Sequence, residues 1–357
     1  MTRGKDPSPD VIAPADPGSG SSAGRPSGGE LVETGGAGGG GGSRGVLVML
    51  PGLTEESADW AGRLEGAVPG LRVCGVEAID EADAAYGVLP RELLGRAGRL
   101  RWLQAPQAGP APEFYYPELV AHPVVVTNMR DTYTDHVAAH TLALVLAMAR
   151  GLPRYVRAQQ AAAWAPDWDP GSVVALGEAS ALVVGAGAVG AEVGRLLSEF
   201  GVAVAGVDVR ITEAPKGFVG VRPLDELDEL LPSADIVVLT VPHTPKTEGM
   251  IDAARLKRFK RSALFVNVGR GPTVRLDDLT EALERGWLKG AALDVFEVEP
   301  LPPAHPLWSR PDVLITPHVA GAGPHAAERR FAVLLENARR FLAGDPLINQ
   351  VDKAQRF

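Results

Sequence analysis

The chain has little cysteine: Cys74 is the only one among 357 residues. A single thiol excludes an intrachain disulfide and a cluster of thiolate metal ligands. Long apolar runs are also missing, because the longest one, at 137–149, is shorter than the ~20 residues that a membrane-spanning helix needs. The amino-terminal stretch has no apolar core of a signal peptide, so we predict a cytoplasmic location.

Basic residues are outnumbered, since 35 Lys and Arg stand against 44 Asp and Glu, for a formal net charge of −9. This charge would repel nucleic acids and anionic membranes overall, so neither is predicted as a partner. A local basic pocket for a small anion is compatible with the same balance. From residue 46 on, the chain has no G-x-S-x-G nucleophile elbow, and the whole chain has no Walker lysine loop, which argues against hydrolase and kinase chemistry.

A metal site is not predicted. His136 and His140 are four residues apart on an expected helix, and such a pair can bind a metal ion. No HExxH glutamate and no third ligand accompany them, so we predict that the pair has another role.

Glycine is abundant, and it is concentrated at the amino terminus. Residues 1–44 are rich in Gly, Ser and Pro and nearly free of large apolar side chains, so they cannot offset the entropy cost of ordering. We predict a disordered tail there. The remaining length is sufficient for two domains with their own cores.

The rest of the chain alternates between short apolar runs and helical patterns, first over 46–130 and again from 180. Apolar strands separated by helices indicate a parallel sheet covered on both faces, so we predict an α/β fold with two doubly wound parallel sheets. Between the two blocks, 134–160 has the apolar spacing of one long helix, and the Trp- and Pro-rich stretch 161–172 is typical of a loop. A last helical pattern begins near residue 326 and can fold back onto the first block.

A glycine loop follows the first strand of the second block. In "ALVVGAGAVGAEVG", Gly185, Gly187 and Gly190 have G-x-G-x-x-G spacing between an apolar strand and a helix. This context favours a dinucleotide phosphate site over a plain glycine-rich turn, because the free N–H groups of the helix start face the phosphate oxygens.

An acid and a base end the next strand. Asp208 follows Gly190 at the distance expected for a carboxylate that binds the adenine ribose hydroxyls. The carboxylate would repel a 2′-phosphate, so NAD(H) is predicted over NADP(H). Arg210 leaves NADP(H) open as an alternative. The arginine is either a ligand of the 2′-phosphate or a solvated surface residue.

Polar residues end three later strands: Arg270 in "VNVGRG", Asp294 and Glu299 in "ALDVFEVEP", and His318 in "ITPHVAG". Ligands of open α/β sheets lie beyond the carboxyl ends of the strands, so these stretches are expected to converge. Taken singly, Arg270 is more typical of a surface ion pair and His318 of a loop histidine, whereas together and in this order they favour a catalytic site.

Over residues 46–345 the chain resembles the D-isomer-specific 2-hydroxyacid dehydrogenases. The resemblance rests on "GAGAVG" with Asp208, "VPHTPKTEGMI", "FVNVGRG", "GAALDVFEVEPLPPAHPLW" and "ITPHVAG", in the order of the family. It implies a catalytic triad of Arg270, Glu299 and His318. The arginine would clamp the carboxylate of a 2-oxo acid with paired donors, and the histidine, oriented by Glu299, would exchange the proton.

The resemblance also implies the remaining site residues. Ala108 and Gly109, next to Gln107, would bind substrate together with Arg270 and His318, although Pro110 departs from the usual substrate loop and removes an N–H. Asp294 would hold the nicotinamide carboxamide, and Thr244, Pro245 and Thr247 would lie over the cofactor. The cofactor-binding residues implied are Gly185, Gly187, Ala188, Val189, Gly190, Asp208, Val209, Arg210, Val241, Pro242, Thr247, Val268, Gly269, Arg270, Asp294 and His318.

The same resemblance divides the chain into a Rossmann NAD-binding domain at 149–324 and a discontinuous, flavodoxin-like substrate domain at 45–148 and 325–350. It implies a homodimer built through the NAD-binding domain. Two aromatic groups have open roles. Phe114, Tyr115 and Tyr116 either line the substrate pocket or pack in the core, and Trp164 and Trp168 either reach a neighbouring subunit's active site or are buried in the interface.

We therefore predict an NAD(H)-dependent oxidoreductase that interconverts a 2-oxo acid and a D-2-hydroxy acid. It would resemble glyoxylate/hydroxypyruvate reductases or short forms of phosphoglycerate dehydrogenase. The alternative from another class is an NAD(H)-sensing corepressor-like protein with little or no turnover. Both keep the triad, so only an activity measurement separates them.

Overall fold

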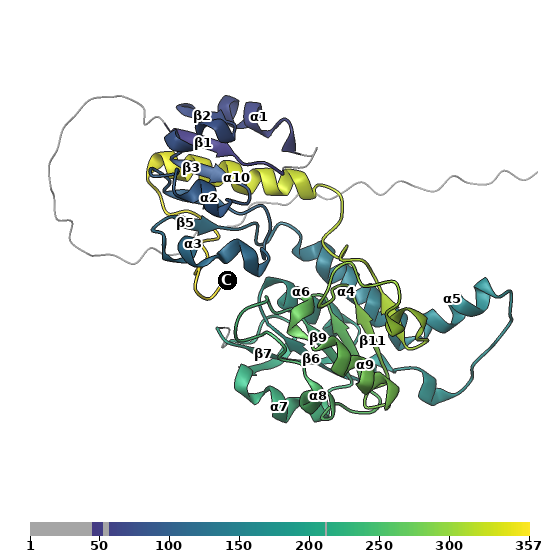
Figure 1. Ribbon diagram of the computed structural model, residues 1–357. Helices are drawn as coiled ribbons and strands as arrows, with labels where there is room; N and C mark the ends of the chain where they lie inside the picture. Colours follow the sequence, from purple (N-terminus) through teal and green to yellow (C-terminus); the bar gives the residue numbers. More distant parts are fainter. Residues whose placement is uncertain (1–44, 53–56, 211–212) are drawn as a thin grey trace, which may run out of the picture. The chain divides into compact units, whose positions relative to one another are not determined.

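The computed structural model describes residues 45–52, 57–210 and 213–357 (Figure 1). The tail predicted at 1–44 lies outside these residues. None of the helices in the described part is both long and apolar enough to cross a membrane. The cytoplasmic location stays a prediction.

The first sheet has five parallel strands in the order β2-β1-β3-β4-β5. Apolar clusters cover both of its faces, and the second cluster includes α10. This order is that of flavodoxin-like doubly wound sheets. The strands are β1 (Gly45–Met49), β2 (Leu71–Cys74), β3 (Ala84–Tyr86), β4 (Trp102–Gln104) and β5 (Val125–Thr127), and the helices around them are α1 (Trp60–Ala67), α2 (Arg91–Leu94), α3 (Pro117–Ala121) and α10 (Ala326–Ala343).

The second sheet has seven parallel strands in the order β12-β11-β10-β9-β6-β7-β8. The strands are β6 (Ser180–Val184), β7 (Ala203–Asp208), β8 (Phe218–Pro223), β9 (Ile236–Leu239), β10 (Leu264–Asn267), β11 (Gly290–Leu293) and β12 (Val313–Ile315). The helices are α4 (Thr134–Ala149), α5 (Leu152–Gln160), α6 (Ala188–Glu199), α7 (Leu227–Leu230), α8 (Ala253–Leu256) and α9 (Leu276–Glu284). Two parallel sheets of this kind confirm the predicted fold class.

Both faces of the second sheet are buried, which explains why its strands are apolar throughout. Leu182 and Val184 of β6 pack in one cluster with residues of α7, α8 and α9. Val183 points to the opposite face and packs in the other cluster, with residues of α4 and α6. Neighbouring side chains on a strand therefore support different helical layers.

The strand order reverses between β6 and β9, which lie side by side although β7 and β8 come between them in the chain. Strands on either side of this point feed helices on opposite faces. Loops that leave the carboxyl ends of β6 and β9 therefore diverge and leave a crevice, where ligands of doubly wound sheets bind.

The prediction of one helix over 134–160 is wrong. The helix stops at Ala149, and a separate helix begins at Leu152. Gly151 between them has a left-handed φ of 65°, and Pro153 lacks the N–H that a continuing helix would need there.

Strand β8 was not predicted. It pairs with β7 at the edge of the second sheet, and its sequence, "FVGVRP", contains a glycine and a proline, which are uncommon in strands. An edge strand needs hydrogen bonds on one side only, so it tolerates these residues.

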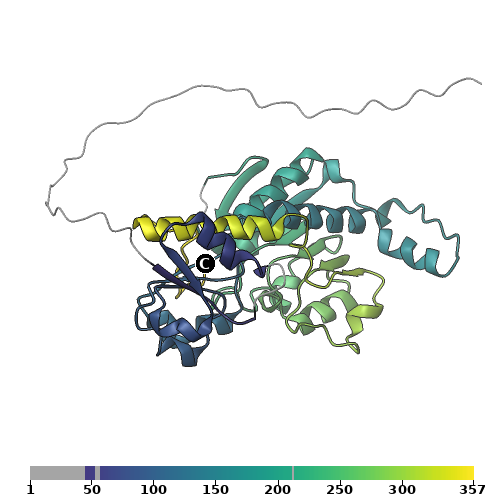
Figure 2. The same cartoon turned by 90° about the horizontal axis from the view of Figure 1, so that it is seen from above.

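The packing of two helices bears on the domain limits. α4 lies within the predicted substrate domain, but its buried side chains, among them Val137 and Val145, pack on the second sheet. α10 follows the second sheet in the chain, yet Phe331 and Leu334 pack with Leu47 of β1. Figures 1 and 2 show α10 alongside β1 and α1. The predicted domain limits stay a prediction. The packing of α4 favours a limit before residue 134 rather than after residue 148.

Candidate active site

The glycine loop connects β6 to α6 at the point of strand reversal. Gly185 has a φ of 98°, and a Cβ there would lie 3.0 Å from Thr240 Oγ1. A Cβ on Gly190 would lie 1.9 Å from Gly185 O. At Gly187, the residue before α6, a Cβ would meet nothing within 4 Å. Two glycines thus allow close packing, and the third leaves open space at the start of a helix, a position at which proteins commonly bind anions.

Asp208, at the end of β7, holds the loop in place. Its Oδ2 accepts a hydrogen bond from Ala186 N and its Oδ1 one from Arg210 N, both at 2.8 Å. These bonds fix the carboxylate at the carboxyl end of β7, beside the glycine loop.

The loop after β9 faces the glycine loop. Thr247 Oγ1 donates to Pro242 O at 2.6 Å and accepts from Thr244 N at 2.8 Å. Both threonines are buried. These bonds make the loop a fixed wall opposite α6.

A cavity of about 400 Å³ lies between these loops and the first sheet's loops. This size is within the usual range for small-molecule sites. Four cationic residues and two acidic ones line it: Arg130, Arg210, Lys246 and Arg270 against Asp131 and Asp208. The cavity is therefore locally basic in a chain of net charge −9, which favours an anionic ligand.

The lining includes every cofactor-binding residue predicted from the sequence except Asp294 and His318, and it includes Ala108 and Gly109. Glu299 is not among the lining residues either. The sequence interpretation did not identify several others, because they carry no dinucleotide motif. These are Asn128, Arg130, Asp131, Tyr133, Thr134, Val137, Val207, Leu224, Thr240, Lys246, Gln355 and Phe357.

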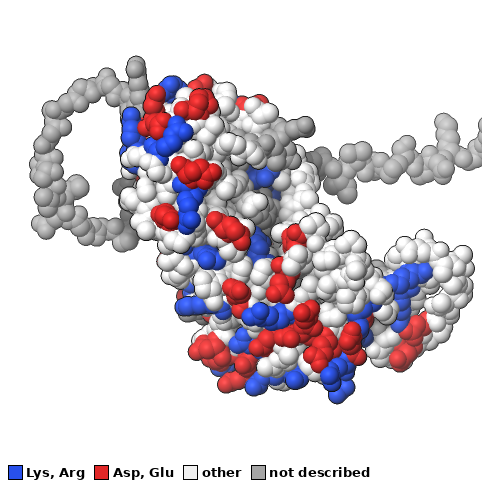
Figure 3. All heavy atoms as spheres, in the orientation of Figure 1, with Lys and Arg blue, Asp and Glu red and all other residues white. Residues whose placement is uncertain are grey.

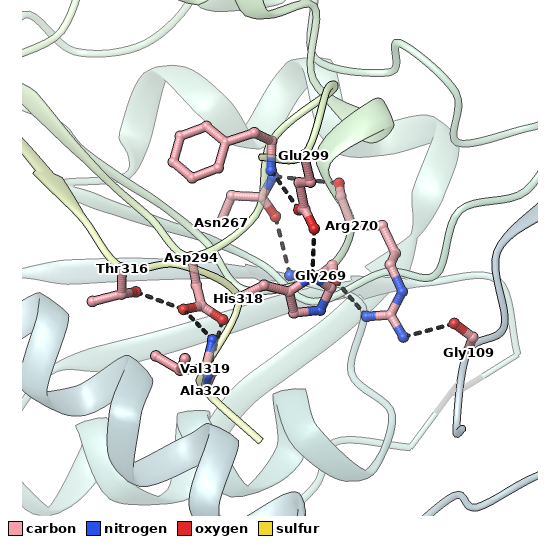
Figure 4. Close-up of polar contacts among 11 residues, drawn as sticks. Gly109, Asn267, Gly269, Arg270, Asp294, Glu299, Thr316, His318, Val319 and Ala320 are labelled. Carbon is pink, nitrogen blue, oxygen red and sulfur yellow. Dashed lines mark hydrogen bonds and ion pairs between the residues drawn. The ribbon is translucent and has the colours of Figure 1, made fainter. Parts of the chain in front are cut away.

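Arg270 follows β10 and reaches across to the first sheet's loops. Its Nη1 donates to Gly269 O at 2.6 Å, and its Nη2 donates to Gly109 O at 3.0 Å (Figure 4). Gly269 in turn donates its N–H to Asn267 Oδ1 at 3.0 Å. The guanidinium is thus held next to the predicted substrate loop.

His318 and Glu299 form a hydrogen-bonded pair, with 2.7 Å between His318 Nδ1 and Glu299 Oε2. Glu299 Oε1 also accepts from Phe296 N at 2.9 Å, so the carboxylate is fixed. The bond to Nδ1 leaves Nε2 as the nitrogen that can exchange a proton with a ligand. The imidazole is 48% exposed, so a small molecule can reach it.

Asp294 supports the segment that carries His318. Its carboxylate is 1% exposed and accepts from Thr316 Oγ1 at 2.6 Å and from Val319 N and Ala320 N, each at 3.0 Å (Figure 4). These bonds stabilise the turn in which His318 has a left-handed φ of 55°. The predicted contact with the nicotinamide carboxamide stays a prediction.

The predicted substrate loop is already hydrogen-bonded in part. Ala108 N donates to the Tyr133 hydroxyl at 3.1 Å, and Ala108 O accepts from Asn128 Nδ2 at 2.7 Å. A substrate carboxylate would therefore compete with Tyr133 for the Ala108 N–H. Its binding through this loop stays a prediction.

The first of the two open aromatic groups packs in the core. Phe114 and Tyr115 are buried in the cluster on the first sheet, and Tyr116 packs against that cluster. Burial raises the pKa of Tyr115 to about 12, so its hydroxyl stays protonated. None of the three lines the cavity.

His136 and His140 do not converge on a common ligand. His140 Nε2 lies 3.0 Å from Thr316 Oγ1, whereas His136 packs against Gly323. Among the described residues, no group of three His, Cys, Asp or Glu side chains is arranged to hold a metal ion.

Comparison with known proteins matches residues 142–320 to a family described as "D-isomer specific 2-hydroxyacid dehydrogenase, NAD binding domain". A glyoxylate reductase of Thermofilum pendens is 34% identical over 231 residues, 64% of this chain and 68% of that protein. A glyoxylate/hydroxypyruvate reductase A of Serratia proteamaculans is 31% identical over 288 residues, 77% of this chain and 89% of that protein.

Among solved structures, a D-isomer specific 2-hydroxyacid dehydrogenase of Xanthobacter autotrophicus Py2, in complex with NADPH and MES, has a TM-score of 0.74. It is 33% identical, and the match covers 88% of this chain and 100% of that one.

Proposed function

Because the chain belongs to the D-isomer-specific 2-hydroxyacid dehydrogenase family, we propose that it reduces a small 2-oxo acid to the 2-hydroxy acid, and the reverse, with a nicotinamide dinucleotide. The observation that carries this proposal is the His318–Glu299 pair on the same sheet edge as Arg270 (Figure 4), which itself lines a basic cavity together with the glycine loop. The bound dinucleotide would supply the hydride.

In this proposal Arg270 binds the carboxylate of the 2-oxo acid with its planar paired donors and polarises the neighbouring ketone. His318 donates a proton from Nε2 to the ketone oxygen as C2 becomes tetrahedral, and in the reverse reaction it accepts that proton. Glu299, bound to Nδ1, keeps the ring oriented. The Tyr133 hydroxyl and the loop at Ala108, which are bonded to each other and line the cavity, would also contact the substrate.

For the cofactor, we propose NAD(H), with Asp208 accepting the ribose hydroxyls and opposing a 2′-phosphate. The helix start at Gly187 would bind the pyrophosphate, and Lys246 is a further cation on the wall of the cavity. Relatives differ in this respect, because the Xanthobacter protein was solved with NADPH. The preference is therefore a property to measure with both dinucleotides.

Purified protein should oxidise NADH when it is supplied with glyoxylate, hydroxypyruvate or another small 2-oxo acid, and NADPH less efficiently. Absorbance at the nicotinamide band measures both rates. The matched relatives are named as reductases, which favours an enzyme over a sensor. Tight NADH binding without turnover across a broad panel of 2-oxo acids would support the sensor instead.

We also propose a homodimer that uses α5 and the following connector. This segment projects from the end of α4 in Figures 1 and 2, and its tryptophans Trp164 and Trp168 are 97% and 88% exposed. Leu152 and Val156 of α5 are also exposed. In Figure 3 the segment is mostly uncharged, whereas charges of both signs cover much of the neighbouring surface. Such apolar exposure is typical of a surface covered by another subunit.

Replacing Trp164 and Trp168 together by aspartate should weaken the dimer by about 100-fold or more, because buried tryptophans contribute strongly to interfaces. Light scattering over a dilution series measures the dissociation constant. Trp308→Asp, at an exposed tryptophan in the short helix Pro306–Ser309, is the matched control. A dimer equally stable in both variants would show that α5 and the following connector are not the interface.

A further inference from the structure

The last residues of the chain line the cofactor cavity. Gln355 and Phe357 are part of its wall, at the end that also includes Asp208 and Arg210. The Phe357 ring lies under the Arg210 guanidinium, with 4.3 Å between Arg210 Cζ and the ring centroid. This contact joins the carboxyl terminus to the end of β7, although about 150 residues separate the two in sequence.

The terminal segment is anchored on the first sheet rather than loosely attached. Val351 is buried in the core cluster of that sheet, and its N–H donates to Val126 O at 2.9 Å. Lys353 Nζ donates to Val124 O at 3.0 Å and also to His122 O. The chain after Val351 therefore leaves the sheet in a defined direction.

Residues 352–357 then close into a compact turn. The Asp352 carboxylate accepts from Ala354 N at 2.9 Å and from Gln355 N at 3.0 Å. Arg356 N donates to Asp352 O at 2.6 Å, and Asp352 N donates to Phe357 O at 3.3 Å. Because the later residues of the turn bond back to Asp352, the backbone of Phe357 is held in place.

The contact with Phe357 leaves Arg210 able to bind an anion. A cation over an aromatic ring is attracted to the face of the ring, whereas the N–H donors of a guanidinium lie at its rim. Arg210 N is also bonded to Asp208 Oδ1 at 2.8 Å. The arginine is thus held at the same corner as the acid that opposes a phosphorylated ribose.

We propose that Phe357 is a specificity-determining residue of the cofactor site, which positions the Arg210 guanidinium so that a dinucleotide with a phosphate on its adenosine ribose is accepted despite Asp208. This inference rests on the proposed dinucleotide function. The carboxyl-terminal turn supplies the ring, and the end of β7 supplies Arg210 and Asp208. The balance between the positioned arginine and the aspartate sets the ratio of NADPH to NADH affinity.

The test is a titration of the full chain with NADH and with NADPH, in which nicotinamide fluorescence reports binding. Phe357→Ala should raise the dissociation constant of NADPH by about three- to tenfold, the range of a partly exposed cation–π contact, and that of NADH by less than about twofold. Phe357→Leu should behave similarly, because leucine keeps apolar bulk but has no π face. Phe200→Ala, at an exposed phenylalanine after α6, should change neither constant.

In an Arg210→Ala background, Phe357→Ala should have no further effect on NADPH, because the ring is proposed to act through the arginine. An unchanged NADPH constant in the single variant would overturn the inference. Tighter NADPH binding by Phe357→Ala would also overturn it, because the carboxyl-terminal turn would then hinder NADPH rather than favour it. An effect of Phe357→Ala that is equally large in the Arg210→Ala background would overturn it as well. If the unaltered protein bound neither dinucleotide, the proposed function itself would be refuted.

Discussion

Replacing His318 by asparagine should lower kcat for 2-oxo acid reduction by about 10²- to 10⁴-fold, the usual contribution of a positioned acid–base group. Asparagine is the appropriate replacement because His318 has a left-handed φ of 55°, which asparagine tolerates better than most residues. The dissociation constant of NADH should change by less than about threefold. Steady-state kinetics and a fluorescence titration of the same preparation measure the two effects.

The matched control is His305→Asn. His305 Nδ1 accepts from Leu307 N at 3.3 Å at the start of a short helix, and asparagine can accept the same bond. This variant should keep its activity. If His318→Asn turned over at the rate of the control, proton transfer by His318 would be excluded, and another group would have to protonate the ketone.

Replacing Arg270 by alanine should lower kcat/KM for the 2-oxo acid by about 10²- to 10⁴-fold. The variant loses two charge-assisted hydrogen bonds to the substrate carboxylate, each worth about 1.5–3 kcal/mol. The dissociation constant of NADH should change much less, by a factor at least tenfold smaller than the loss in kcat/KM for the 2-oxo acid. A comparison of kcat/KM with the NADH dissociation constant separates the two.

Arg270→Lys refines this result. Lysine keeps the positive charge but not the planar pair of donors, so its kcat/KM should lie between those of the alanine variant and the unaltered protein. Arg285→Ala is a control, because Arg285 is exposed and pairs with Glu281 on α9. Equal activity of Arg270→Ala and Arg285→Ala would remove Arg270 from the proposed mechanism.

The effects of His318→Asn and Arg270→Ala should differ in kind because the two side chains act on different parts of the substrate. His318 acts at the ketone oxygen, so its loss appears mainly in kcat. Arg270 acts at the carboxylate in both the ground state and the transition state, so its loss appears in KM as well. The bond from Arg270 Nη2 to Gly109 O adds a structural role, since it links the two sheets' loops at the site.

Local patterns in the sequence were sufficient for the fold class and for the glycine loop, whereas much of the remaining predicted cavity wall came from the family resemblance. Apolar runs separated by helical patterns predict parallel sheets because both faces of such a sheet are buried. The glycine loop is predictable because Gly185 and Gly190 occupy positions where a Cβ would be too close to neighbouring backbone or side chains. The elements that were missed have weak local signals: the edge strand β8 and the break at Gly151 between α4 and α5.

Only the tertiary structure decided which distant residues meet. The packing of α4 on the second sheet depends on which apolar face finds a partner, and the helical pattern does not specify that partner. The three hydrogen bonds to Asp294 and the contact of Phe357 with Arg210 likewise join segments far apart in sequence. Periodicity and spacing report the local backbone, whereas these contacts depend on how the sheets and the carboxyl-terminal turn pack together.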